Sequence, residues 1–510
     1  MLSYSTVTTV GREKMVFNLK RLNKQTNKQV YIHSVVLVLL YFGIDFTIEY
    51  ATDTYSAFNE TGTWRHMLYE NARPMEALIY YVIESLNIPP GIIYHISQTA
   101  AILLLSLSVA IFALILKNYF SDETLCLFVS FVTFVNPFFI EFMLFVEKGL
   151  FMFIILLNIM AVRQTERSWR TGESSLVRDI IIVQTSLWIS VLIYQTIIQV
   201  YAILCLPFIA ICSKSIKGFL QKNIFVMIMY GIPMGSAYML AKYVFVVERI
   251  DNGLDMAGKL KNFVEIFRFV TVDKFYTLNK GLFMIWLLLL LMTAVSVIIG
   301  CRQHRLRTLF FTAYISVGCT VMSFLLYITG NSTTCWPRMV YTYGMLFGIV
   351  TLYLMYEWKK TRLMRRISVV SGILAVALLG SVALFNYLSF GKVFLERHRA
   401  NQEDMYYAEL IGQRISEYED ETGITIDTLC YYKDKNISVF GEGFDDSRLS
   451  ERAQASGWSR HSSIEIYLDK DYIQGEPDPR LQELFQEKNW DMFSEEQLVF
   501  DGNVLHICVY

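Results

Sequence analysis

Long apolar runs recur along the first 390 residues of this 510-residue chain. Most have about 17–25 residues, the length of helix that crosses the hydrocarbon core of a bilayer. Only 18% of the residues are charged, against about 25% in an average soluble domain, so the chain lacks the polar surface for several soluble domains. We therefore predict an α-helical polytopic membrane protein with about 11 transmembrane helices. The predicted spans are 30–48, 93–116, 121–138, 145–162, 179–193, 195–212, 223–246, 281–300, 308–328, 339–356 and 367–389.

Basic residues are distributed unevenly around these spans. If residues 1–29 are a cytoplasmic N-terminal segment, the segments on that side carry 22 Lys and Arg, against 10 on the other side. Because cytoplasmic loops carry an excess of Lys and Arg, this orientation is favoured. Joining the two spans at Tyr194-Gln195 into one helix would move later basic loops outside, so a tight hairpin is predicted there. The prediction is a multi-pass cell-membrane protein whose C-terminal region is extracytoplasmic.

The end of the chain differs in composition from the membrane domain at 30–390. Residues 390–510 hold 12 Lys and Arg against 25 Asp and Glu. An amphipathic helix is expected at 401–421, strand-like runs at 424–432, 463–468 and 496–510, and a second helix near 479–489. Residues 391–510 are therefore predicted to form a small extracytoplasmic α/β domain. Cys430 and Cys508 end two of the strand-like runs, and a disulfide between them is a hypothesis.

The first outer loop, 49–92, contains the best candidates for acid–base chemistry. Asp45, Glu49 and Asp53 follow one another at a spacing of four, which places them on one face if the first helix continues. One of these carboxylates could act as a general base on a hydroxyl group. The alternative is that all three are ordinary interfacial acids. Residues 73–86 begin with Arg73-Pro74 and are predicted to form a helix lying in the outer interface.

Five short stretches resemble a known group of enzymes. They are ATDTYSAF (51–58), NARPMEALIYYV (71–82), NPFFIEFMLF (136–145), LIYQTIIQVY (192–201) and PRMVYTYG (337–344). In their order and topology they are similar to the GT-C superfamily of membrane glycosyltransferases, and within it to the type-II O-antigen glucosyltransferase family. Many members of that family have paired acids in the first loop, whereas here Asp53 is followed by Thr54. The identity of the base is therefore open among Asp53, Asp45 and Glu49.

The resemblance implies a GT-C-like fold and a transfer reaction. Such enzymes take a sugar, here expected to be glucose, from a polyprenyl-phosphate donor and pass it to an extracytoplasmic cell-surface glycan. Direct displacement would invert the anomeric carbon. The departing phosphate needs a nearby cation, for which Arg73, Lys148 and Arg338 are the candidates. Arginine suits phosphate better than lysine because its planar fork donates two parallel hydrogen bonds.

Four further residues are candidates for substrate binding. Glu141 and Glu147 could bind acceptor hydroxyls or assist Asp53, or they could simply pair with Lys148. Tyr194 and Gln195 could orient the sugar or phosphate, or could satisfy backbone groups exposed between two spans.

Other patterns argue against competing classes of function. The seven histidines show no paired ligand spacing, so no metal site is predicted; no cofactor is certain, and a divalent cation is left open. No basic patch is interleaved with stacking aromatics, so nucleic acid is not an expected partner. The expected partners are the sugar donor, the glycan acceptor and the lipid bilayer. The alternative functions are a polysaccharide polymerase and a lipid-linked oligosaccharide flippase.

Overall fold

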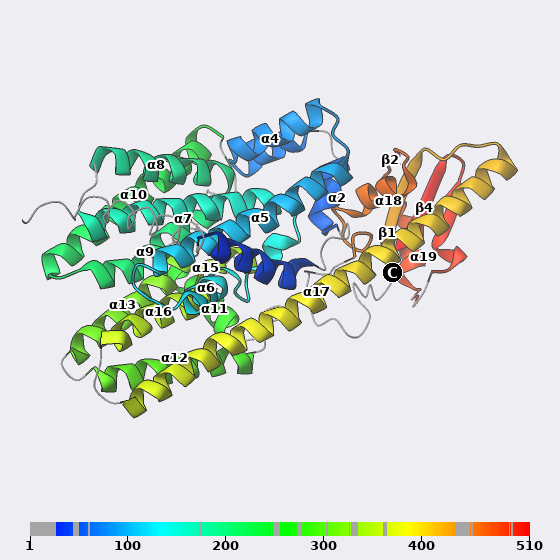
Figure 1. The fold of residues 1–510 in the computed structure, drawn as a ribbon. Coiled ribbons are helices and arrows are strands. Elements are labelled where there is room, and N and C mark those ends of the chain that lie inside the picture. Colours follow the sequence, from blue (N-terminus) through cyan, green and yellow to red (C-terminus); the bar gives the residue numbers. More distant parts are fainter. Residues whose placement is uncertain are drawn as a thin grey trace, which may run out of the picture.

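A computed structural model shows a helical bundle joined to a small C-terminal domain by one long helix (Figure 1). The structure describes residues 27–43, 50–59, 62–172, 176–245, 256–272, 280–301, 304–325, 335–360, 365–433, 452–488 and 493–509, together with residues 247, 278, 327, 449 and 490.

Among the described residues, the bundle is built almost entirely from helices. After the first helix, over residues 27–42, the elements are α2 (Thr52–Asn59), α3 (Thr63–Arg65), η2 (His66–Glu70), α4 (Pro74–Ser85), α5 (Pro90–Leu116), α6 (Glu123–Phe134), η3 (Ile140–Met143), α7 (Lys148–Thr171), α8 (Leu176–Ile193), η4 (Gln195–Ile198), α9 (Gln199–Cys212), α10 (Ile216–Tyr243), α11 (Met256–Thr271), α12 (Lys280–Gly300), α13 (Arg305–Ser323), η6 (Pro337–Met339), α15 (Tyr341–Gly344), α16 (Leu346–Lys360) and α17 (Arg365–Thr422).

The predicted fold class is confirmed, because seven of these helices are long and apolar enough to cross a membrane. They are α5, α7, α9 taken with η4, α10, α12, α13 and α17. Each of the other predicted spans overlaps a helix of the bundle in the part of the chain that the structure describes, and Tyr194 separates α8 from α9 as expected.

The predicted spans 121–138 and 145–162 need correction at their ends. Helix α6 stops at Phe134 after 12 residues, and α7 begins only at Lys148. The chain between them is buried but irregular, with the short η3 in its middle. Pro137 explains the break, because it lacks a backbone N–H and disfavours helix at the preceding Asn136. The irregular chain packs closely on α15, where a Cβ on Gly344 would lie 2.2 Å from the Asn136 side-chain oxygen.

Helix α4 fulfils the helix prediction for residues 73–86, with Pro74 in its first turn. Its apolar side chains Leu78 and Val82 are 58% and 45% exposed, whereas Glu76 and Tyr80 are buried against the protein. Glu76 and Tyr80 of this helix therefore face the interior of the molecule. Its location in the membrane interface stays a prediction.

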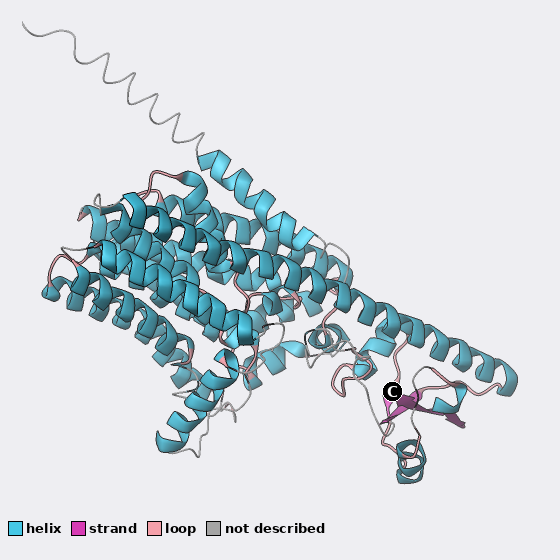
Figure 2. Cartoon of the chain, turned by 90° about the horizontal axis from the view of Figure 1, so that it is seen from below, coloured by secondary structure: helices cyan, strands magenta, loops and turns pink. Residues whose placement is uncertain are grey.

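Helix α17 is continuous over 58 residues, from the bundle to the tip of the C-terminal domain (Figure 2). The predicted last span and the predicted amphipathic helix are thus two parts of one helix. The C-terminal domain adds β1 (Thr428–Lys433), α18 (Arg460–Leu468), β2 (Ile473–Gln474), α19 (Pro479–Gln486), η8 (Glu495–Gln497), β3 (Leu498–Asp501) and β4 (Val504–Val509). The sheet order is β2-β1-β4-β3, with β1 parallel to both of its neighbours and β3 antiparallel to β4.

One strand prediction in this domain was wrong, and a second needs to be divided. Residues 463–468 alternate like a strand but belong to α18, because short apolar runs fit either structure and this one packs on α2 and α17. The run 496–510 is divided at Gly502, whose φ of 61° allows the turn between β3 and β4. Cys430 and Cys508 lie on adjacent strands, but Cys430 is opposite His506 and both thiols are free, so the hypothetical disulfide is not formed.

Candidate functional site

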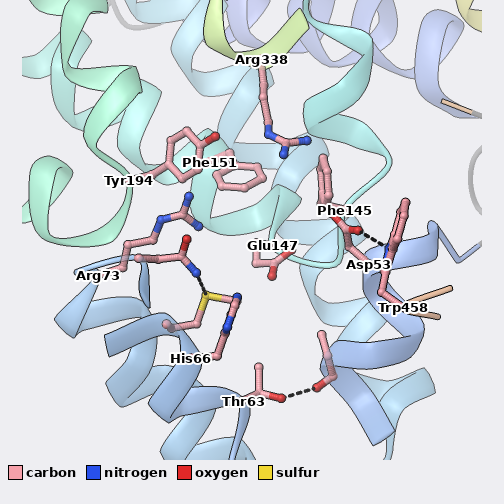
Figure 3. A pocket seen from close by; sticks show the side chains of 13 residues that line it. Asp53, Thr63, His66, Arg73, Phe145, Glu147, Phe151, Tyr194, Arg338 and Trp458 are labelled. Atoms are coloured by element: carbon pink, nitrogen blue, oxygen red, sulfur yellow. Dashed lines mark hydrogen bonds between the residues drawn. The ribbon is translucent and has the colours of Figure 1, made fainter. Parts of the chain in front are cut away.

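A cavity of about 500 Å³ lies where α2 and other short elements meet the C-terminal domain. Figure 3 shows the side chains that line it. Side chains from α2, α4's N-terminus, η2, the segment before α7, the α8–α9 turn, η6 and the C-terminal domain surround it. The lining residues are Asp53, Ala57, Thr63, His66, Met67, Asn71, Arg73, Phe145, Glu147, Phe151, Tyr194, Arg338 and Trp458.

Arg73 stands directly before α4, whose first turn is also the positive end of the helix dipole. Its Nη1 donates to Glu76 Oε2 at 3.1 Å, and its guanidinium lies 4.3 Å from the centre of the Tyr194 ring. Its Nε has no hydrogen-bond partner among the described residues. The Arg73 side chain is therefore held on two sides while its guanidinium points into the cavity (Figure 3).

Glu76 is fully buried beneath Arg73. Burial raises the pKa of the Glu76 carboxyl to about 7, although the Arg73 charge acts in the opposite direction. The nearby Glu147 carboxyl adds to the rise. Glu76 therefore changes its charge close to neutral pH, which alters how strongly Arg73 is neutralised.

Arg338 brings a second cation from a distant part of the sequence. It lies in η6, and its Nη1 and backbone N–H both donate to the Glu141 carboxylate, the backbone bond having a length of 2.7 Å. Its guanidinium also stacks on the Phe145 ring at 4.7 Å. Figure 3 shows it entering the cavity from the side opposite Thr63.

Asp53 lies in the first turn of α2 and is exposed to the cavity. Its Oδ1 accepts a hydrogen bond of 3.1 Å from the Trp458 indole N–H, which comes from the C-terminal domain. The buried Thr52 and Thr54 flank it. Asp53 is thus the accessible carboxylate of this helix, whereas Asp45 and Glu49 lie outside the described residues.

Glu147 occupies the floor between these groups (Figure 3). Its carboxylate accepts a short hydrogen bond from the Tyr80 hydroxyl of α4. Burial raises the pKa of the Glu147 and Glu141 carboxyls above their ordinary value. Glu141 differs from Glu147 because it sits behind Arg338 and lines a neighbouring cavity.

Of the remaining predicted residues, Tyr194 lines the cavity and Gln195 supports it. The Gln195 side-chain amide donates to the backbone carbonyls of Asn71 and Ala72, at 3.3 and 2.9 Å. Ala72 has a φ of 52°, a strained value for a residue with a Cβ. Gln195 therefore holds the strained turn that leads into Arg73.

Lys148 takes no part in the cavity. It is fully buried at the start of α7, where its Nζ donates to the Tyr94 hydroxyl at 3.0 Å and to the Gln98 side chain at 2.5 Å. The sequence predicted that Lys148 could pair with Glu141 or Glu147. Instead, Glu141 pairs with Arg338, and Glu147 accepts a hydrogen bond from Tyr80. Burial against α5 explains the difference, since α5 and α7 pack along much of their length.

A second cavity of about 270 Å³ adjoins the first. It shares Asp53, Phe145, Arg338 and Trp458 with the larger cavity. Its other lining residues are Ala51, Thr52, Glu141, Leu144, Trp336, Arg397 and Leu449.

Some lining residues were not predicted from the sequence. Glu76 had a local signal, because an acid three residues after Arg73 at a helix start can pair with it. His66 is a single histidine with no ligand spacing. Trp458 lies 405 residues from its partner Asp53, and no local pattern marks it.

The segments that meet here are separated by even numbers of the predicted spans. Two predicted spans lie between Asp53 and Glu147, two from Glu147 to Tyr194, four between Tyr194 and Arg338, and two between Arg338 and Trp458. An even number of crossings returns a chain to the same side of a membrane. The arrangement is thus consistent with one alternation of spans throughout, including the short α6.

The chemical capacity of the site follows from its charges. Two guanidinium groups at one cavity can bind a phosphate, and an accessible carboxylate beside them can accept a proton. Among the residues that the structure describes, no three carboxylate, histidine or cysteine side chains are grouped so that they could hold a metal ion.

Comparisons with known proteins give little further guidance. No family model and no curated protein matches the chain. Among solved structures, the chain is similar to ArnT from Cupriavidus metallidurans bound to undecaprenyl phosphate, with a TM-score of 0.41 and 11% sequence identity, over 87% of this chain and 85% of that one. A likeness of this size assigns no function, and the interpretation below depends on the geometry of the site.

Proposed function

We propose that the protein is a GT-C-type membrane glycosyltransferase that transfers a sugar from a polyprenyl-phosphate donor to an extracytoplasmic glycan. The observation that supports this most is the convergence of Arg73, Arg338 and Asp53 on one cavity at the end of a membrane-type bundle. A lipid-linked phosphate would reach such a site from the bilayer. By the family resemblance, the sugar is glucose and the acceptor is a cell-surface polysaccharide.

In the proposed reaction, the acceptor hydroxyl oxygen forms a bond to the anomeric carbon of the donor. The bond from this carbon to the phosphate oxygen breaks, and its electron pair leaves with the phosphate. Asp53 accepts the hydroxyl proton, and Arg73 and Arg338 stabilise the charge on the departing polyprenyl phosphate. Attack from the face opposite the phosphate inverts the anomeric carbon.

The remaining polar residues have supporting roles in this proposal. Glu76 and Glu141 hold the two guanidinium groups, and Tyr194 stacks under Arg73. Glu147 binds donor or acceptor hydroxyls from the cavity floor. Preorganised charges of this kind are the largest contribution to many enzymatic rate enhancements, because they need not reorganise during the reaction.

The decisive experiment incubates the purified protein with a panel of polyprenyl-phosphate sugars and a glycan acceptor, and measures released polyprenyl phosphate. Release that depends on one donor sugar, with a single sugar added to the acceptor, is the expected result. Processive growth of the acceptor would instead identify a polymerase. A flippase would move lipid-linked oligosaccharide across vesicles without breaking the phosphate bond.

The proposed orientation places the cavity outside the cytoplasm. It is tested by cysteine substitution at two exposed positions, Arg480 in the C-terminal domain and Lys217 in the first turn of α10. In intact cells, an impermeant thiol reagent should label R480C but not K217C. Labelling of K217C alone would reverse the orientation and contradict the proposal.

A further inference from the structure

The C-terminal domain is built into the site rather than attached beside it. Trp458 lines both cavities and donates its indole N–H to Asp53. Its side chain is 53% exposed, so a large part of the ring can contact a ligand. This placement gives the domain a direct part in substrate binding.

The position of Trp458 is fixed by a buried network on α17. Asp404 is 1% exposed and accepts hydrogen bonds from Arg452 Nε at 3.0 Å and from the Ala453 backbone N–H at 2.6 Å. The Gln454 side chain donates to the Asp404 carbonyl at 2.6 Å. These bonds tie the segment before Trp458 to the long helix.

The helix that carries Asp53 is tied to the same part of α17. The Tyr55 hydroxyl donates to the Asn401 side-chain oxygen at 2.9 Å, and the Asn401 amide donates to the Tyr50 carbonyl at 3.0 Å. Tyr55 also shares a 2.5 Å hydrogen bond with Tyr467 of α18. Asp53 and Trp458 are therefore held relative to one another by a common support.

The two cavities differ in the chemistry that they offer. Arg73 belongs only to the larger cavity, which holds both arginines that the reaction assigns to the donor phosphate. The smaller cavity adds Trp336 to the shared Trp458, and its other guanidinium, Arg397, is 2% exposed and donates to the Leu449 carbonyl. Tryptophan rings pack against the C–H faces of a pyranose, while Asp53 and Thr52 can accept from its hydroxyls.

We propose that the smaller cavity is the acceptor subsite and that it takes one uncharged pyranose ring of a glycan against Trp458. The inference rests on the proposed function, and it adds where the acceptor binds. A volume of about 270 Å³ suits a single ring, since it lies near the lower limit of small-ligand sites. Asp53 lines both cavities. A base at this position can take a proton from an acceptor in the smaller cavity while that acceptor attacks a donor in the larger cavity.

The subsite is tested by glycan binding to the full-length protein without any donor. The probes are neutral oligosaccharides of glucose, galactose, mannose and N-acetylglucosamine, measured by saturation-transfer NMR and calorimetry. We expect at least one to bind, and Trp458→Ala to weaken that binding by about tenfold. The matched control is Trp64→Ala, because Trp64 packs on Tyr81 and lines neither cavity.

A second variant separates the two roles of the indole. Trp458→Phe keeps an aromatic face but removes the N–H that binds Asp53. We expect the acceptor KM to stay within about twofold and kcat to fall by about threefold to tenfold, the range expected for loss of one hydrogen bond. A variant that merely loosened the domain would move both constants and would also change the melting temperature.

The outcomes distinguish the two proposals. Glycan binding that is absent from the wild-type protein, or unchanged in Trp458→Ala, would overturn the acceptor subsite even if donor turnover is observed. Glycan binding that depends on Trp458, without turnover of any polyprenyl-phosphate sugar, would leave the subsite standing and overturn the transferase.

Discussion

The two ends of the helical bundle carry similar ion pairs that join very different parts of the chain. Away from the site, Arg170 pairs with Glu166 one helical turn before it, and Lys117 pairs with Glu123 across a short turn. At the site, Arg338 pairs with Glu141, 197 residues away. Pairs of the first kind stabilise helix ends, and Glu166 also accepts a hydrogen bond of 2.7 Å from the Tyr119 hydroxyl beyond α5.

The long-range pair has a different purpose. Burying a carboxylate and a guanidinium is expensive, and a well-packed apolar pair would often be as stable. Glu141 and Glu76 are 3% and 0% exposed, each beneath an arginine that faces a cavity. Glu166 is equally buried at the other end, but its partner Arg170 lines neither cavity. The comparison teaches that ion pairing serves the helices at one end of the bundle and positions cations for a ligand at the other.

The strongest test of this contrast removes a carboxylate at each end. Asp53→Asn keeps the size and most hydrogen bonds of the side chain but removes its basicity. We expect turnover to fall by at least about 100-fold, the lower limit for general-base catalysis, with donor binding largely kept. The measurement is polyprenyl phosphate release, and Glu123→Gln at the far end is the control, expected to stay within about twofold. Near-normal turnover of a folded Asp53→Asn protein would transfer the role of base to Glu49 or Asp45.

Removing one arginine at each end is the next test. Arg338→Ala deletes a donor-phosphate ligand and leaves Glu141 buried without its cation, so kcat/KM for the donor should fall by about tenfold to 100-fold. Arg170→Ala removes a comparable pair away from the site and should change kcat/KM by less than about twofold. Arg338→Lys should restore only part of the loss, because a lysine cannot donate the parallel pair of bonds. Equal effects at both ends would show that Arg338 is merely structural.

Features that depend on a local stretch of sequence could be predicted, whereas features that depend on distant packing partners could not. Apolar runs of spanning length identify the helices of the bundle because each run alone determines its helix, and the break at Tyr194 follows from charge and length. The break after Phe134 has a local signal that the span prediction did not use, because Pro137 disfavours helix at Asn136 before it and lacks a backbone N–H. A segment that looks like the end of a span is thus an irregular wall of the site.

Part of the site could also be predicted from the apolar runs, because the runs show which polar residues lie at their ends. Asp53, Arg73, Tyr194 and Arg338 stand out because polar residues at the ends of apolar runs are few, and they do meet at one cavity. Lys148 has the same signature but is turned inward to Tyr94 and Gln98. The direction of a side chain on a helix depends on the packing partner, which a single sequence does not contain.

A smaller effect is expected from the strained turn before Arg73. Gln195→Ala removes the two hydrogen bonds to the Asn71 and Ala72 carbonyls, so the turn can relax and displace Arg73. We expect kcat/KM for the donor to fall by about threefold to tenfold, as for the loss of one or two hydrogen bonds. Gln184→Ala is the matched control, because Gln184 also donates to a backbone carbonyl, that of Met229, but away from the cavity. An unchanged donor KM in Gln195→Ala would mean that the turn holds its shape without this bond.

The smallest expected effect is a pH dependence of donor binding set by Glu76. Its pKa is raised to about 7, first by burial, so the carboxyl is mostly neutral at pH 6 and mostly ionised at pH 8. A donor phosphodiester keeps one negative charge over this range. At pH 8 the ionised Glu76 competes with the donor for Arg73, so we expect the donor KM to be about threefold lower at pH 6 than at pH 8.

The sign of the linked stability change provides an independent check. Since the pKa of Glu76 is higher in the folded protein than its ordinary value of 4.5, the folded state binds this proton more tightly than the unfolded state. The stabilisation is present below pH 4.5 and is lost as the pH rises through 7. Glu76→Gln should therefore remove both the pH dependence of the donor KM and this contribution to the melting temperature. If the donor KM of Glu76→Gln kept its full pH dependence, the titrating group would be a different residue. The Arg73–Glu76 pair would then have only a structural role, like the ion pairs at the far end of the bundle.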